Sequence, residues 1–116
     1  MNSNPTNLIF STEGFANRAD LAMHSEDKMA KLLRHAQPHV DRVRVHVKRE
    51  APHSRAPYFA VCATAESAGP NYVAHAESAE PVVAINAAFD KLERSVLAAA
   101  RARTHQRRHA EHAELV

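Results

Sequence analysis

The strongest constraint on the fold is a change of hydrophobic period near the middle of the chain. Within residues 40–50, every second position is apolar, at Val43, Val45 and Val47. The positions between them are basic: Arg42, Arg44, His46 and Lys48. A period of two is typical of a β-strand with one buried face. The segment is therefore predicted to be a strand that turns a basic face to solvent.

Two other segments carry the helical period. From Arg18 to about residue 36 the apolar residues recur at helical spacing, with Ser25 on the same side, and Pro38 closes the segment. These apolar residues are Leu21, Met29, Leu32, Leu33 and Ala36. A second helix is predicted from about Pro81 to about Arg108, because Ser78, Glu80 and Pro81 are good helix-start residues. It should pack through Ile85, Phe89, Leu92 and Val96, and its end should project beyond the core.

Three further strands complete the pattern. Residues 7–12 form a short β-branched and aromatic run, and residues 57–67 and 71–78 are alanine-rich strand candidates joined by a turn at Ala68, Gly69 and Pro70. Pro52 and Pro57 favour a loop over 51–57. The predicted class is α+β, in the order β-α-β-β-β-α, with two helices packed on one face of a four-stranded, largely antiparallel sheet. One domain is expected over residues 7–108, with flexible tails at 1–6 and 109–116.

The second helix also carries a basic stripe opposite its apolar side. Residues 66–90 contain four acids and no Lys or Arg, whereas residues 91–108 contain six bases and one acid, in a chain whose formal net charge is only +2. The stripe consists of Lys91, Arg94, Arg101, His105 and Arg108. A concentrated positive patch attracts phosphates over about 8 Å in physiological salt. Together with the basic sheet face it favours nucleic acid over a merely solvated helix face.

Composition excludes several other classes. Cys62 is the only cysteine, so disulfide frameworks and multi-cysteine zinc sites are excluded within one chain. No apolar run approaches the roughly 20 residues of a membrane span, and residues 1–10 lack the features of a secretory signal. We expect a cytoplasmic protein with no membrane partner, no cofactor and no small-molecule substrate.

Catalytic and metal-binding alternatives are weaker. Cys62 and His75 could suggest a thiol nucleophile, but no orienting acid is identified, so no enzymatic activity is expected. The histidine spacings at His35 and His39, and at His105, His109 and His112, could place imidazoles near one another. They are interpreted as surface residues that add positive charge below about pH 6.5. Three aromatic residues could stack on bases but are interpreted as packing residues: Tyr58, Phe59 and Tyr72.

Several short motifs, in their order and spacing, resemble one known family. The first helix contains Lys28-Met29-Ala30-Lys31-Leu32, and the next strand is entered through Val40-Asp41-Arg42-Val43. The last strand ends in Ala76-Glu77-Ser78, followed by Ala84-Ile85-Asn86 and Asp90-Lys91-Leu92-Glu93-Arg94. The sequence thereby resembles the ribosome hibernation-promoting factors and ribosome-associated inhibitors, also called sigma-54 modulation proteins, over about residues 8–108. It is similar to a short form, without the dimerisation domain of the long members.

This resemblance implies binding to the small ribosomal subunit, in the channel where messenger RNA and transfer RNA lie, and inhibition of translation in slow-growing cells. By position, it implies RNA-facing roles for Lys28, Lys31, Lys91, Arg94 and Arg101. Strand alternation adds Arg42, Arg44 and Lys48, and the helical stripe adds Arg108. Two alternatives remain: a protein-interaction module that modulates a transcription factor, and a general binder of structured RNA.

Overall fold

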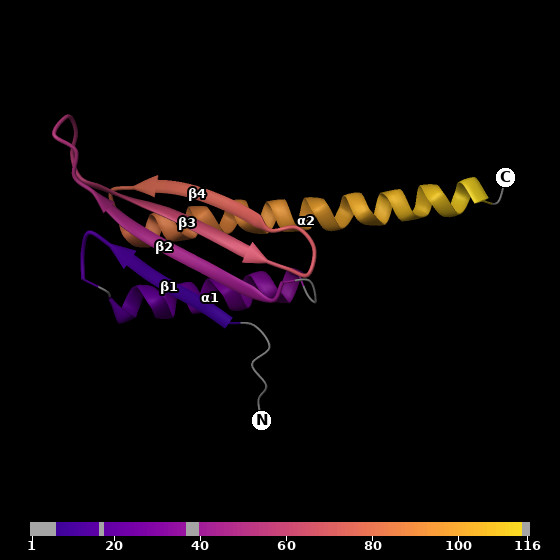
Figure 1. The fold of residues 1–116 in the computed structure, drawn as a ribbon, viewed down its shortest axis with the longest axis horizontal. Coiled ribbons are helices and arrows are strands. Elements are labelled where there is room, and N and C mark those ends of the chain that lie inside the picture. Colours follow the sequence, from indigo (N-terminus) through magenta and orange to yellow (C-terminus); the bar gives the residue numbers. More distant parts are fainter. Residues whose placement is uncertain (1–6, 17, 37–39, 115–116) are drawn as a thin grey trace, which may run out of the picture.

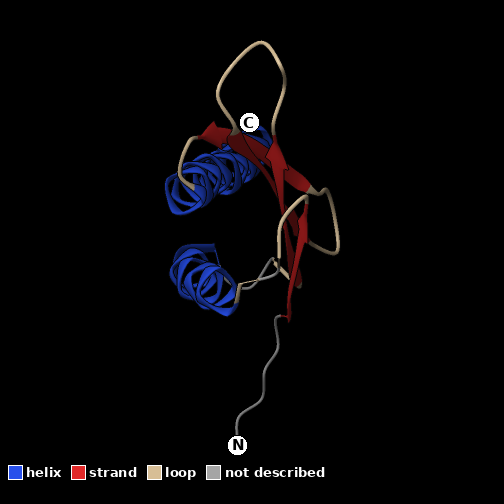
Figure 2. Ribbon diagram, turned by 90° about the vertical axis from the view of Figure 1, so that its left-hand side faces the viewer, coloured by secondary structure: helices blue, strands red, loops and turns tan. Residues whose placement is uncertain are grey.

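The computed structural model describes residues 7–16, 18–36 and 40–114, with side chains described up to Ala102 in the last range. It contains β1 (Asn7–Glu13), α1 (Ala19–Ala36), β2 (Arg42–Glu50), β3 (Tyr58–Glu66), β4 (Tyr72–Ser78) and α2 (Pro81–Glu114). Both helices lie on the same side of the sheet (Figure 2). The predicted α+β class and the β-α-β-β-β-α order are confirmed.

The strands are ordered β1-β2-β3-β4 across the sheet. β1 pairs with β2 in parallel, while the β2–β3 and β3–β4 pairs are antiparallel. A parallel pair needs a long crossover, which α1 supplies, whereas the antiparallel pairs need only loops. In β2, Val43, Val45 and Val47 are buried and the basic residues between them lie on the opposite face, as the alternation predicts. We call this opposite face, away from the helices, the outer face of the sheet.

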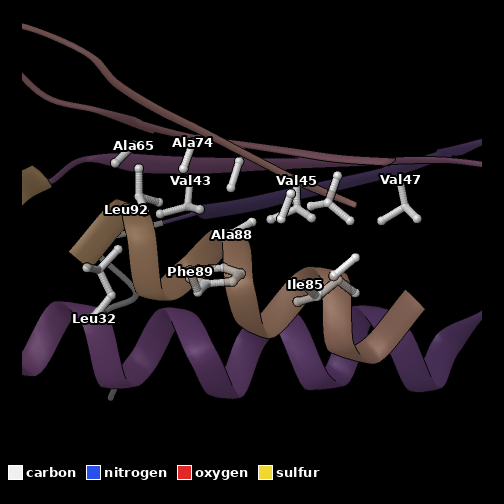
Figure 3. Close-up of a cluster of buried hydrophobic side chains, with 14 of the residues drawn as sticks. Leu32, Val43, Val45, Val47, Ala65, Ala74, Ile85, Ala88, Phe89 and Leu92 are labelled. Atoms are coloured by element: carbon white, nitrogen blue, oxygen red, sulfur yellow. The ribbon is translucent and has the colours of Figure 1, made fainter. Parts of the chain in front are cut away.

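The core fills the space between the sheet and the helices. Ile85, Phe89 and Leu92 of α2 are buried there (Figure 3). Val96 is buried as well, as the sequence predicts. α1 contributes Leu21 and Leu32, while Met29 and Leu33 are only partly buried beside them. Small side chains on β3 and β4 allow α2 to approach the sheet closely: Ala63, Ala65, Ala74 and Ala76.

The two helices run side by side in the same direction. His24 of α1 bonds Asn86 near the start of α2, and farther along the helices Lys31 and Glu93 line one groove. Ser25 is buried on α1, and its hydroxyl donates to the Leu21 carbonyl at 2.9 Å. This bond satisfies a polar group that burial would otherwise penalise.

α2 is longer than expected. It continues to Glu114, so the predicted end near Arg108 is wrong. The last buried residue of its described part is Val96, and Figure 1 shows the distal part of the helix projecting past the sheet. The sequence after Val96 contains no glycine or proline and is rich in alanine and arginine, which favour helix. Residues 1–6 and 115–116, predicted to lie in tails, fall outside the described residues.

Two turns follow from local chemistry. Gly14, after β1, has a φ of 86°, and a Cβ added there would lie 2.8 Å from the Arg49 carbonyl oxygen. Only glycine meets both demands without strain. In the β3–β4 turn the Ser67 hydroxyl donates to the Pro70 carbonyl at 2.6 Å and accepts from the Gly69 amide at 3.2 Å. Within the described residues, no helix has the combined length and apolar character needed to cross a bilayer.

Candidate nucleic-acid interface

The bases of α2 whose side chains are described lie on its solvent side, as predicted. Arg94 and Arg101 are exposed, and neither makes an ion pair or hydrogen bond to another residue in the described part of the chain. Lys91 is also exposed, but its Nζ donates to the His75 backbone carbonyl on β4 at 2.8 Å. Arg108 belongs to α2, and its side chain lies outside those described. Among the described bases of this surface, the two arginines are therefore the ones without a described partner that would compete with an external anion.

The lysines of α1, unlike the two arginines, lie beside acidic residues. Lys28, half-buried, and Lys31, exposed, line a narrow groove between α1 and α2. Asp90 and Glu93 of α2 line the same groove. The groove thus carries both signs of charge, and its acids partly offset the attraction of the two lysines for phosphate.

The bases of the outer sheet face have acidic partners. The Arg42 Nη1 lies 3.4 Å from a Glu66 carboxylate oxygen, and the Arg44 Nε donates to the other oxygen of Glu66. Lys48 Nζ lies 3.6 Å from both Glu13 and Glu50 carboxylate oxygens. The positive face predicted from β2 alone is therefore an ion-paired surface.

His46 joins the same network. Its Nε2 lies 3.0 Å from a Glu13 carboxylate oxygen, and its Nδ1 lies 2.8 Å from the Ser11 hydroxyl. The hydrogen bond from His46, followed by the charge of Lys48, lowers the pKa of the Glu13 carboxyl below its ordinary value. Glu13 and Glu66 are not evident from the sequence as partners of these bases. They become neighbours of the bases only through the β1–β2 and β2–β3 registers, which one strand's alternation does not reveal.

Cys62 and His75 are direct neighbours on β3 and β4, and His46 lies opposite Cys62 on β2. The three residues line a shallow hollow on the outer face together with Lys48 and Glu77. The described residues hold no group of three or more His, Cys, Asp or Glu side chains placed to bind a metal ion. His39 lies outside the described residues, and the side chains of His35, His105, His109 and His112 lie outside those described.

The aromatic residues are engaged in packing. Phe59 and Tyr72 pack against the core, and the Phe59 ring meets Phe15 edge-on with ring centroids 5.2 Å apart. Tyr58 lies under the Arg55 guanidinium, 3.8 Å from its ring centroid, and Arg55 also pairs with Glu77 at 3.3 Å. The packing interpretation of these rings is thus confirmed.

The chain matches one protein family in sequence and resembles solved structures in fold. The sequence model of the family described as sigma 54 modulation protein / S30EA ribosomal protein matches residues 8–104. A ribosomal subunit interface protein from Coxiella burnetii has a TM-score of 0.68 at 16% identity, over 82% of this chain and 98% of the other. The N-terminal domain of Thermus thermophilus Protein Y has a TM-score of 0.61 at 20% identity, over 78% and 94%. At these identities the likeness concerns the fold alone. No curated protein matches the chain.

Proposed function

This chain belongs to the sigma 54 modulation protein / S30EA ribosomal protein family, and we propose that it is a ribosome-associated factor that binds the RNA of the small subunit and inhibits translation. The proposed site is the channel that messenger RNA and transfer RNA otherwise occupy. Such an action needs occupancy and no chemical reaction, so the protein acts as a non-enzymatic, cytoplasmic hibernation factor with no cofactor.

The observation that carries this proposal is the pair Arg94 and Arg101. Both are exposed on α2 and make no ion pair within the described part of the chain. Their Cα atoms are seven residues, or about 10 Å, apart along the helix axis. Each guanidinium offers a planar pair of donors suited to a phosphate. Two such groups on one rigid helix favour two separate phosphates of a folded RNA over a single small anion.

Folded ribosomal RNA is recognised largely through phosphate, sugar and shape. Each phosphate neutralised by Arg or Lys releases condensed counterions, which drives binding and makes it sensitive to salt. In this proposal Lys91 and Arg108 extend the arginine pair along α2, and Lys28 and Lys31 add contacts from α1. α2 is the principal contact because Arg94 and Arg101 give up no ion pair within the described part of the chain on binding.

The bases of the outer sheet face take a secondary role. Arg42 and Arg44 share Glu66, and Lys48 lies between Glu13 and Glu50. A phosphate that contacts them must displace a carboxylate or sit beside it, so part of the Coulomb attraction is cancelled. These bases are proposed to contribute to general attraction more than to the bound geometry.

The test is sedimentation of ribosomal particles on sucrose gradients with added protein, at low and high salt. We expect wild type to comigrate with small subunits at low salt and to be released at high salt. The Arg94→Ala/Arg101→Ala variant should comigrate weakly. The matched control, Arg34→Ala/Arg49→Ala, removes the same charge from two exposed residues on α1 and β2 and should bind nearly as wild type.

Two results would contradict the proposal. If wild type stays at the top of the gradient at low salt, ribosome binding is refuted and a protein partner becomes the leading alternative. If the two double variants lose binding equally, net charge matters but α2 is not the contact surface.

A further inference from the structure

The two edges of the sheet are protected differently. At the β4 edge the His75 carbonyl accepts a hydrogen bond from Lys91, whose helix packs on β4. At the other edge, β1 pairs only with β2. No backbone hydrogen bond to the outward side of β1 occurs among the described residues. The edge therefore presents a row of unpaired amide and carbonyl groups.

The residues of β1 do not prevent another strand from pairing with these unpaired backbone groups. Its sequence, NLIFSTE, contains no proline and no lysine, and its single charge, Glu13, stands at the end of the strand. The outer-face residue Ile9 is 39% exposed. Proteins commonly protect edge strands with lysine, proline or a bulge. Ile9, Phe10 and Thr12 give β1 the β-branched and aromatic character that favours strand pairing.

Apolar side chains beside this edge are incompletely covered. Leu8 and Phe10, on the inner face of β1, are only partly buried, as are two residues of α1, Met29 and Leu33. Helical spacing places Met29 and Leu33 on the flank of α1 opposite Lys31, which faces α2. The open backbone edge and the partly covered apolar rim thus lie on the same side of the molecule.

We propose that two copies of the chain associate through antiparallel pairing of β1 with β1 about a two-fold axis at Phe10. The two sheets then form one continuous sheet. In this register Phe10 lies opposite Phe10 of the second copy, Ile9 opposite Ser11, and Leu8 opposite Thr12. The apolar rims of the two copies meet below the joined sheets and are removed from water.

The residues of β1 are compatible with two-fold pairing to a second copy, and they favour the register centred on Phe10. A two-fold axis must place residues of the same sheet face opposite one another, so it can pass through one residue of β1. An axis at Phe10 pairs the whole strand, whereas an axis at Ile9 or Ser11 shortens the ladder. It also places Glu13 opposite Asn7, so no like charges meet. Aromatic cross-strand pairs are favourable in antiparallel sheets.

The expected dimer is weak because the shared strand is short. Interfaces below the standard size usually belong to transient complexes. We expect a dissociation constant between about 10 μM and 1 mM. The interface lies at β1, at one edge of the sheet, whereas the proposed RNA contact lies on α2, which packs against β3 and β4 toward the opposite edge (Figure 1). The dimer therefore does not depend on RNA binding, and the two proposals fail independently.

The test is sedimentation velocity of the full chain from about 1 μM to 1 mM, across the expected dissociation range. The Ile9→Lys/Ser11→Lys variant places lysine opposite lysine twice in the proposed register and should weaken the dimer by about tenfold or more. The Ile9→Lys/Ser11→Glu variant places lysine opposite glutamate twice and should restore it. Both variants lose the same Ser11–His46 hydrogen bond, so they are matched in that respect.

Val73→Lys is the control, because Val73 is 51% exposed on the outer face and lies in the same cross-strand row as Ile9, at the opposite edge. It should dimerise as wild type does. Circular dichroism melting verifies that every variant is folded. Wild type that remains monomeric at about 1 mM overturns the proposal outright, whether or not another protein pairs with β1. A dimer equally strong in both charge variants, or lost in Val73→Lys, also overturns it.

Discussion

His24 of α1 and Asn86 of α2 are joined by a hydrogen bond in which the imidazole Nε2 donates to the amide Oδ1 at 2.6 Å. The two residues are far apart in sequence, and the bond is partly buried between the helices. It links α1 to α2 at one level, on helices that also carry Lys28, Lys31 and Arg94. Sequence periodicity defines each helix separately and gives no such link.

Removing this bond should loosen the helix pair. Asn86→Ala should lower the free energy of unfolding by about 1 kcal/mol, the typical net value of one hydrogen bond. His24→Ala should cost a similar amount, and the double variant should cost less than the sum because both changes remove the same contact. Urea titration of the four proteins measures this coupling. Strict additivity would show that the bond contributes nothing to stability.

Glu13 should make stability depend on pH at the acidic end. Its folded-state pKa is lowered by the hydrogen bond from His46 and by the charge of Lys48. A lowered folded pKa means that the ionised carboxylate stabilises the fold above its unfolded pKa of about 4.5 and that this contribution disappears as the pH falls through the folded value. Glu13→Gln should therefore be less stable than wild type near pH 6, with the difference shrinking below pH about 4.

Urea unfolding of wild type and Glu13→Gln between neutral and acidic pH measures this difference. Glu26→Gln, which changes an exposed acid on α1, is the control and should follow the pH curve of wild type. A constant difference between wild type and Glu13→Gln at every pH would contradict the assignment.

The two glycines should respond differently to alanine. Gly14→Ala introduces a Cβ 2.8 Å from the Arg49 carbonyl oxygen at a φ of 86°, so it should destabilise the fold by about 1–3 kcal/mol. Gly69→Ala meets no atom within 4 Å and should change stability by less than about 0.5 kcal/mol. Thermal melting of wild type and the two variants measures both losses of stability. Equal losses would show that the β1–α1 turn is not held as described.

Salt dependence should identify the RNA contact surface. For purified small subunits, the slope of log K against log salt should become shallower by about 1.5 in Arg94→Ala/Arg101→Ala, because two phosphate contacts are lost. Arg42→Ala/Arg44→Ala should change the slope less, since Glu66 already pairs with both arginines. Fluorescence anisotropy over a salt series gives both slopes. A larger change in the sheet variant would move the principal contact to the outer face.

The sequence predicted the elements well because their periods are strong. Val43, Val45 and Val47 defined β2, and Ile85 and Leu92 defined the buried side of α2, both of which the structure confirms. The prediction already carried α2 past Val96, the last buried residue of its described part, but it ended the helix near Arg108. The sequence beyond Arg108 contains no glycine or proline, and the helix continues to Glu114.

The electrostatics of the outer face were not predictable in the same way. The positions of Arg42, Arg44 and Lys48 follow from alternation within one strand. Their partners, Glu66 and Glu13, depend on which strands become neighbours and in what register. Formal charge along the sequence therefore overstated how positive that face is, whereas Arg94 and Arg101 have no described acidic partner.

Because α2 projects past the sheet, its inner and outer turns are under different constraints on mutation. The buried residues of α2, which end at Val96, hold the core, so mutation at those positions is limited by folding. Arg101 lies beyond that boundary, where a substitution alters charge without opening a cavity. Over evolutionary time the strength of the proposed RNA attachment could therefore be adjusted by changing the outer turns of one helix, while the folded domain that carries it remains the same.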